Sequence, residues 1–132
     1  MSRTIISTDK APAPVGAYSQ AVKAGSFLFV SGQIALDPKT GKLVNRDLAA
    51  ETKQVLENLK AVVEAGDCSF PEDLVKVNIY LSDISFFGTV NEVYGQYFSE
   101  RPPARACIQA AGLPKNVRVE IECTAYLQSR GS

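Results

Sequence analysis

Residues 74–81 read LVKVNIYL, and apolar and polar side chains alternate through this stretch. One set is apolar and consists of Val75, Val77, Ile79 and Leu81. The residues that alternate with this apolar set are Lys76, Asn78 and Tyr80. Because successive side chains of a strand point to opposite faces of its sheet, the alternation predicts a strand with two different faces.

The segments on either side of this strand carry helical patterns. Apolar residues at helical spacing predict a helix over 47–65, and they are Leu48, Val55, Leu56, Leu59, Val62 and Val63. Asp47 or Asn45 is expected to cap its start, and Gly66 is expected to form a left-handed C-cap. A stripe of aromatic residues and valines predicts a second helix over about 84–98, capped by Ser82 or Asp83.

Further strands are predicted before and after these elements. Apolar or alternating runs predict strands at 3–6, 26–34, 104–110 and 119–127, and the turn at 37–42 predicts a hairpin to 43–44. The 26–34 run is continuously apolar, which is typical of a buried strand. The order β-β-β-α-β-α-β-β predicts one α+β domain over 1–132, with a mixed sheet and two helices packed on one face. The strand at 74–81 could pair in parallel with an earlier strand through a right-handed crossover.

Two helices on one face leave the second face of the sheet either solvated or buried between copies of the chain. The alternation of the three late strands assigns polar, aromatic and small side chains to this second face. They are Lys76, Asn78, Tyr80, Arg105, Cys107, Gln109, Glu120, Glu122, Thr124 and Tyr126.

The composition excludes several classes of function. The 132 residues include 14 Lys and Arg against 14 Asp and Glu, and this neutrality disfavours a nucleic-acid partner. No apolar run approaches the ~20 residues of a membrane helix, so a membrane partner is not expected. The three cysteines are odd in number and form no CxxC pair, which predicts a reducing compartment, the cytoplasm.

The chain contains no histidine, which excludes Ser-His and Cys-His dyads within it. Histidine-based metal sites are excluded as well, and the three scattered cysteines are poor substitutes, so we expect no metal. Acid–base chemistry near neutral pH must come from Glu, Asp, Tyr, Lys, water or the substrate.

Arg105 and Glu120 are the pair that could carry chemistry. They lie on the polar positions of two consecutive predicted strands, and the side chains would be close if those strands were neighbours. One interpretation is a cross-strand salt bridge. The other is a site for a small anion, in which Arg105 grips a carboxylate by two parallel hydrogen bonds and Glu120 holds or activates a water.

Three further features are candidates for the same site. Cys107 could be a nucleophile, but no histidine can deprotonate it, and a small buried side chain is the alternative. Tyr18 lies in the Pro/Gly-rich loop APAPVGAYSQ and could close a pocket. Ser31 and Gly32 in SGQ could bring backbone N–H groups close to a ligand, although a turn would use the same residues.

Several motifs resemble one known family over nearly the whole chain. They are PARACI at 103–108, GLP at 112–114, VEIE at 119–122, APAPVGAYSQA, VSGQIALDPKTG, NLKAVVEAG and TVNEVYGQYF. These segments are similar to the reactive intermediate deaminases, the RidA branch of the YjgF group. The resemblance implies a chorismate-mutase-like α+β fold, a homotrimer with a central β-barrel, and active sites in clefts between subunits.

The resemblance also implies an activity, which is the hydrolysis of 2-imino acids and their enamine tautomers to 2-keto acids and ammonia without a cofactor. Arg105 would bind the substrate carboxylate and Glu120 would position the attacking water. Cys107 would contribute its main chain more than its sulfur, and Tyr18 would close the cleft. Ser31, Gly32, Asn91 and Pro114 would line the cleft.

Two alternatives remain open from the sequence. Some proteins of this group have been described as endoribonucleases or translation inhibitors, which the neutral charge and the absence of histidine disfavour. The second alternative is a small-carboxylate-binding module with a regulatory or chaperone-like role and no turnover.

Overall fold

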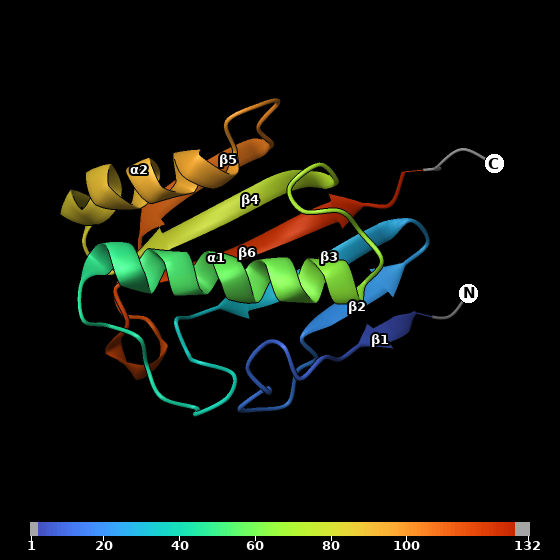
Figure 1. Cartoon of the computed structure of the whole chain (residues 1–132), viewed down its shortest axis with the longest axis horizontal. Helices are drawn as coiled ribbons and strands as arrows, with labels where there is room; N and C mark the ends of the chain where they lie inside the picture. The colour runs from blue at the N-terminus through green and yellow to red at the C-terminus, as the bar shows by residue number, and fades with distance from the viewer. Residues whose placement is uncertain (1–2, 129–132) are drawn as a thin grey trace.

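Six strands form one mixed sheet whose spatial order differs from the order along the chain. The computed structural model describes residues 3–128. The order across the sheet is β1-β2-β3-β6-β4-β5 (Figure 1). The strands are β1 (Thr4–Ile6), β2 (Ala21–Ala24), β3 (Phe27–Gln33), β4 (Leu74–Leu81), β5 (Ala104–Gln109) and β6 (Val119–Tyr126). Neighbouring strands are antiparallel except β4 and β5, which are parallel.

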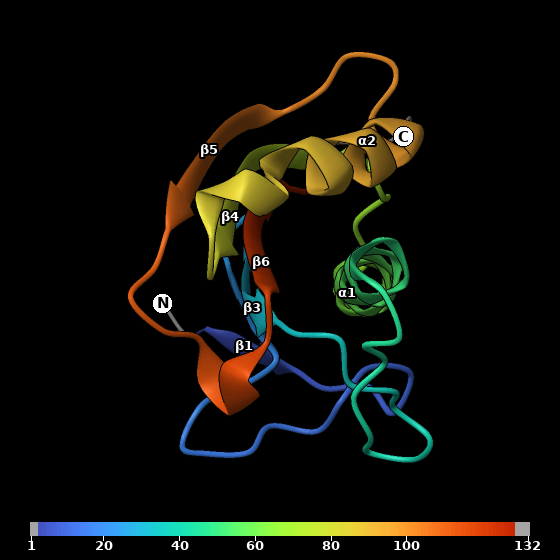
Figure 2. The same ribbon diagram turned by 90° about the vertical axis from the view of Figure 1, so that its left-hand side faces the viewer.

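Both predicted helices are present, and they lie on the same side of the sheet (Figure 2). Helix α1 (Leu48–Ala65) begins at Asp47, whose side chain accepts a hydrogen bond of 2.7 Å from the Ala50 N–H. A 3₁₀ turn, η1 (Ile84–Phe86), is capped by Asp83 and leads into helix α2 (Phe87–Tyr97). The caps predicted at Asp47 and Asp83 are therefore confirmed, because both side chains accept the free N–H groups of a first turn.

The core lies between the helices and the sheet face that they cover, which we call the helix face. Helix α1 packs against β3 and β6, and its buried apolar side chains are Val55, Leu56, Leu59, Val62 and Val63. Burying each such side chain contributes roughly 1.5–3 kcal/mol. Within residues 3–128, neither helix has the length and apolar composition needed to cross a membrane.

The other face of the sheet carries no α-helix in the described part of the chain, and we call it the open face (Figure 2). The prediction that the strand at 26–34 is buried is wrong in part, because one face of strand β3 is exposed. Phe27 is 43% exposed and Phe29 is 48% exposed, whereas Leu28 and Val30 are buried. Phe27 lies edge-on to Tyr126 with 5.0 Å between ring centres. The open face is thus partly apolar and aromatic.

Gly66 follows helix α1 as predicted, but it does not take the left-handed backbone conformation that was the expected reason for a glycine there. Gly66 has a φ of −87°, which is not left-handed, and Asp67 takes the positive φ of 66° instead. A Cβ at Gly66 would come within 2.6 Å of Leu28 Cδ2. Glycine is required there because the end of the helix approaches β3 closely.

Three predictions about the strands are also wrong. The short segment Ala21–Ala24 is a strand, whereas 43–44 forms no strand and only a single bridge joins Leu36 to Leu43. Strand β4 pairs with β5 and β6 and with no earlier strand. The crossover joins β4 to β5 through α2, because parallel neighbours need a long connection.

Candidate active site

Arg105 lies on the helix face, which contradicts the prediction that it shares a face with Glu120. In the parallel pairing of β4 with β5, Arg105 is opposite Val77 and Cys107 is opposite Ile79. In the antiparallel pairing of β4 with β6, Glu120 is opposite Tyr80. Since paired residues point to the same side, Arg105 and Cys107 accompany the buried Val77 and Ile79, whereas Glu120 lies on the open face.

The predicted cross-strand salt bridge between Arg105 and Glu120 is therefore wrong. Strand β4 lies between β5 and β6, so the two side chains are separated by a strand as well as by the sheet itself. The ion pairs found within residues 3–128 join Lys23 to Asp67, Arg46 to Asp47 and Arg118 to Glu51. Arg105 takes part in none of these.

The Arg105 side chain is held by helix α2. Its Nη1 donates a hydrogen bond of 2.7 Å to Oδ1 of Asn91. Its guanidinium carbon lies 4.9 Å from the ring centre of Tyr94 and 5.5 Å from that of Phe87. Arg105 remains exposed, and a guanidinium has five N–H donors in a fixed fork. The side chain is thus oriented while most of its donors stay available to an anion.

Cys107 is a half-buried residue packed against the core. Burial raises the pKa of its thiol, and the nearby Arg105 charge lowers it by less. The thiolate is the nucleophilic form of cysteine, so this environment disfavours a nucleophile. We call Asn91, Arg105 and Cys107 together the arginine cluster.

The other predicted site residues surround a cleft on the open side of the molecule. This cleft has a volume of about 380 Å³. Five predicted residues line it, namely Tyr18, Ser31, Gly32, Pro114 and Glu120. Glu122 lines it too, together with residues of the 12–20 loop and of β3. We call this space the glutamate cleft, since its lining within residues 3–128 includes two glutamates and neither lysine nor arginine.

A bulge in β3 shapes the floor of the glutamate cleft. Val30 pairs with Cys123, but Gln33 pairs with Ile121, so β3 has one residue more than β6 in this interval. The extra length falls at Ser31 and Gly32. A Cβ at Gly32 would lie 2.9 Å from the Glu120 carboxyl carbon, so only glycine leaves room for that carboxylate. The apolar pattern of 26–34 gave no signal of the bulge.

Glu120 is the titratable group whose carboxylate lies against this floor. Burial raises the pKa of its carboxyl group, and the charge of Glu122 raises it further. Among the hydrogen bonds of residues 3–128, none involves the Glu120 side chain. This carboxyl group is therefore free to bind a water or to exchange a proton.

The walls of the cleft are tied to the sheet by residues that the sequence did not single out. Buried Gln20 donates to the carbonyls of Thr8, Ala11 and Pro12, at 3.0, 3.3 and 2.8 Å. Ser31 Oγ donates to the Ser19 carbonyl at 2.6 Å. These bonds fix the loop that carries Tyr18, whose ring is 48% exposed. The only sequence signal for these hydrogen bonds was the position of Gln20 at the end of a Pro/Gly-rich loop.

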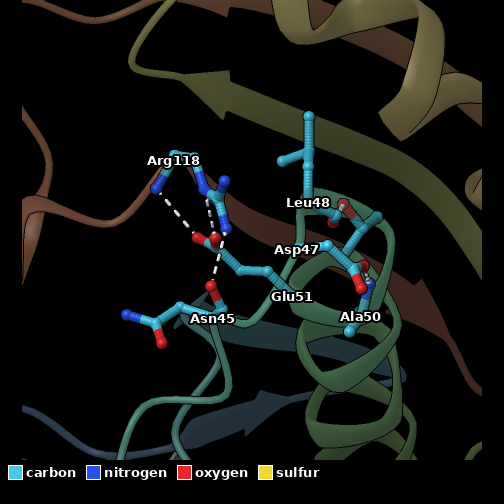
Figure 3. Close-up of polar contacts among 7 residues, drawn as sticks. Asn45, Asp47, Leu48, Ala50, Glu51 and Arg118 are labelled. Carbon is cyan, nitrogen blue, oxygen red and sulfur yellow. Dashed lines mark hydrogen bonds and ion pairs between the residues drawn. The ribbon is translucent and has the colours of Figure 1, made fainter.

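A partly buried ion pair fixes the start of β6, two residues before Glu120 (Figure 3). The Glu51 carboxylate accepts 2.7 Å and 2.8 Å hydrogen bonds from Nε and the backbone N–H of Arg118. Arg118 Nη2 also donates to the Asn45 carbonyl at 3.1 Å. The Glu51 side chain is only 1% exposed and that of Arg118 is 33% exposed, so this partly buried pair joins the first turn of α1 to the start of β6. It was missed because Glu51 looks like an ordinary surface residue of a helix.

The structure thus divides the predicted site residues into two groups. The arginine cluster holds a cation beside helix α2, and the glutamate cleft holds two carboxylates on the open face. In residues 3–128, no three Cys, Asp or Glu side chains are grouped as a metal site requires. A site for a small carboxylate substrate and a water needs a cation for the carboxylate and a base for the water, and each group has only one of these.

Residues 8–127 match the protein family described as Endoribonuclease L-PSP. A relative from Rattus norvegicus named 2-iminobutanoate/2-iminopropanoate deaminase is 51% identical over 123 residues, which are 93% of this chain and 89% of that protein. A RutC family protein of Pyrococcus horikoshii is 51% identical over 124 residues, covering 94% of this chain and 98% of the other.

The solved structures include close matches as well. The crystal structure of RidA from an Antarctic Psychrobacter species matches with a TM-score of 0.89 and 48% identity. The match covers 94% of this chain and 99% of that one. At such identity and coverage, the sheet and helices described above are the fold of this group of proteins.

Proposed function

This chain belongs to the endoribonuclease L-PSP (YjgF/RidA) family, and we propose that it is a deaminase that hydrolyses 2-imino acids and their enamine tautomers. The products would be 2-keto acids and ammonia, and the reaction would protect pyridoxal-phosphate enzymes from 2-aminoacrylate. The observation that carries the proposal is the 51% identity, over 93% of the chain, with a protein named for this reaction. The two groups of side chains support it.

The active site would be formed between copies of the chain. Arg105 and Glu120 are on opposite faces of one sheet, so the two side chains of one chain cannot hold one small substrate together. The glutamate cleft lacks a cationic lining residue, and Arg105 of a neighbouring copy would supply one. Exposed Phe27, Phe29 and Tyr126 on the open face would be covered in the homotrimer with a central barrel that the family resemblance implies.

The role of the arginine cluster is to bind the substrate. The guanidinium of Arg105 would grip the carboxylate shared by 2-imino and 2-keto acids through two parallel hydrogen bonds. Asn91 and the rings of Phe87 and Tyr94 orient the guanidinium, which reduces the entropy lost on binding. Cys107 would contribute its main chain.

The glutamate cleft would bring in the water. Glu120 would accept a proton from the water as its oxygen bonds to C2 of the imine, and the resulting carbinolamine would lose ammonia as the C–N bond breaks. Protons taken from the water pass to the nitrogen, so imine and water become ketone and ammonia with no oxidant or reductant. Tyr18, Ser31, Gly32 and Pro114 would shape and close the cleft.

The test is to mix the protein with a serine dehydratase and serine, and to time pyruvate release against buffer. We expect the protein to accelerate release from the imine, Arg105→Ala to abolish the acceleration, and Arg46→Ala to retain it. Arg46 is a suitable control because it is an exposed arginine that belongs to neither group. Equal pyruvate release with and without the protein would refute the proposal.

The family description names a second activity, cleavage of RNA. Arg105 and Glu120 could in principle serve phosphate chemistry, although the chain has no basic surplus. RNA cleavage that survives extensive purification and is lost in Arg105→Ala would support this activity. Cleavage that is unchanged in Arg105→Ala would come from a contaminating nuclease.

A further inference from the structure

The two glutamates of the glutamate cleft differ in how they are held. Glu120 and Glu122 are two residues apart on β6, so both point to the open face, and both line the cleft. A strand rises roughly 3.3 Å per residue, which places the two carboxylates within interaction distance of each other. A pair of carboxylates in one site often divides into one fixed charge and one group that carries protons.

Glu122 is the fixed member of this pair. Its Oε2 accepts a hydrogen bond of 3.1 Å from Asn78 Nδ2 and one of 3.0 Å from Tyr80 Oη. Both donors come from β4, where Asn78 pairs with Glu122 and Tyr80 pairs with Glu120. Burial and the bond to Glu122 raise the pKa of Tyr80, so this phenol stays protonated and remains a donor.

Glu120 is the free member. Its carboxyl group lies against Gly32, is partly buried, and has no hydrogen bond within residues 3–128. The titratable groups near it are Glu122 on its own strand, Tyr80 on β4 and Tyr18 in the loop across the cleft. The residues of β3 that line the cleft with it are Ser31, Gly32 and Gln33, which do not titrate. Among residues 3–128 of one chain, Glu122 is therefore the one charged residue besides Glu120 in the lining of this cleft, and the proposed assembly adds Arg105 of a neighbouring copy.

We propose that Glu122 is a positioning residue, held in place by Asn78 and Tyr80, whose negative charge adapts Glu120 to carry protons from the attacking water to the leaving nitrogen. This inference rests on the proposed deaminase function. Glu120 would take a proton from the water as the C–O bond forms, and would give it to the nitrogen of the carbinolamine. It would then take the hydroxyl proton and transfer it to the nitrogen, so that ammonia is the leaving group when the C–N bond breaks.

The physical basis is the mutual repulsion of two carboxylates. The charge of Glu122 raises the pKa of Glu120, in addition to the effect of burial. A stronger base accepts a proton from water more readily, so the raised pKa of Glu120 favours its taking the proton of the attacking water. Asn78 and Tyr80 both donate hydrogen bonds to Glu122, whereas Glu120 accepts none within residues 3–128, so the oxygens of Glu120 are the ones available to the water.

The experiment compares Glu122→Gln with Glu64→Gln, which removes an exposed carboxylate from α1 instead. The readouts are the pH profile of kcat/KM and an NMR titration of the ¹³C-labelled glutamate carboxyl groups, with the Glu120 signal assigned by Glu120→Gln. In Glu122→Gln we expect the Glu120 titration and the acid limb of the profile to move to lower pH. We expect kcat to fall while KM stays near its original value, because Arg105 holds the carboxylate.

The inference would be overturned if the Glu120 titration and the acid limb of the pH profile stayed unchanged in Glu122→Gln. It would also be overturned if both moved as far in Glu64→Gln as in Glu122→Gln. If Glu122→Gln fails to fold, Tyr80→Phe is the second variant, since it keeps the ring and removes one of the two donors. It should lower kcat more than it raises KM, and equal kcat in Tyr80→Phe and the original protein would also overturn the inference. If the original protein has no deaminase activity, the proposed function fails, and the NMR titration still decides whether Glu122 controls Glu120.

Discussion

Arg105 and Glu120 point to opposite faces of one sheet, with strand β4 between their strands. Arg105 is held beside helix α2, and Glu120 lies at the floor of a cleft of about 380 Å³ on the open face. A single chain therefore separates the cation from the carboxylate that the proposed reaction requires. This separation leads to the first prediction, which concerns how two defective chains complement each other.

Mixing Arg105→Ala chains with Glu120→Gln chains should restore activity that neither variant has alone. If each site takes Arg105 from one copy and Glu120 from another, about one site in four of an equal mixture receives two intact residues. The mixture should be unfolded and refolded together to exchange subunits, and then assayed for imine hydrolysis. Recovery of about a quarter of the original activity is expected, and no recovery after proven exchange would mean that the site does not form between copies.

Gly32→Ala should lower kcat strongly while changing the stability little. The added Cβ would overlap the Glu120 carboxylate, which is the far end of a flexible side chain and can move away. The catalytic group would thus be displaced while the fold adjusts. Initial rates and thermal unfolding together check this.

Gly95→Ala is the matched control for that variant, because nothing lies near the position of its Cβ. It should leave the rate unchanged and stabilise α2 by about 0.5–1 kcal/mol. Equal rates for Gly32→Ala and the original protein would show that the close approach to Glu120 is not needed for activity.

Glu51→Gln should destabilise the protein by about 2–4 kcal/mol, because it weakens two partly buried hydrogen bonds between a buried carboxylate and Arg118. Denaturant unfolding measures the free energy. The exposed Glu64→Gln should stay within about 0.5 kcal/mol of the original protein. A loss of stability as small as that of Glu64→Gln would mean that the pair of Figure 3 does not fasten β6 to α1.

Cys107→Ala should retain substantial activity, in contrast to Arg105→Ala. Burial raises the pKa of the Cys107 thiol, so near neutral pH the protonated form dominates more than in a free cysteine. Alkylation of Cys107 by iodoacetamide should accordingly be slower than that of a model thiol at pH 7, and should accelerate as the pH rises above 9. Mass spectrometry of the labelled peptide follows this reaction.

The same thiol chemistry gives a prediction for stability at high pH. Burial raises the pKa of Cys107, and it also raises that of buried Cys123, in the folded protein relative to the unfolded chain. Between the two pKa values the unfolded chain binds fewer protons, so the free energy of unfolding falls as the pH rises above about 9. Cys123→Ala, compared at pH 7 and pH 10, should show a smaller decline. An equal decline would assign the effect to other groups.

Local patterns were sufficient for most of the secondary structure. The helical stripe of 47–65, the caps at Asp47 and Asp83, and the alternation of 74–81 and 119–127 all correspond to observed elements. These features depend on the neighbours of a residue along the chain, so the sequence contains their causes. The short strand β2 and the bulge at Ser31–Gly32 carry no such local signal.

The sequence by itself determined which residues are candidates, that the protein has two helices and a mixed sheet, and that no histidine can take part. Only the tertiary structure decided that β4 lies between β5 and β6, and that Arg105 faces the helices while Glu120 faces away. The alternation of β5 predicted Arg105, Cys107 and Gln109 on the face without helices, but that face carries the other set, which is Ala104, Ala106 and Ile108. The reason is physical: β5 is an edge strand, so its register with β4 determines where its side chains point, and no pattern within the strand records that register.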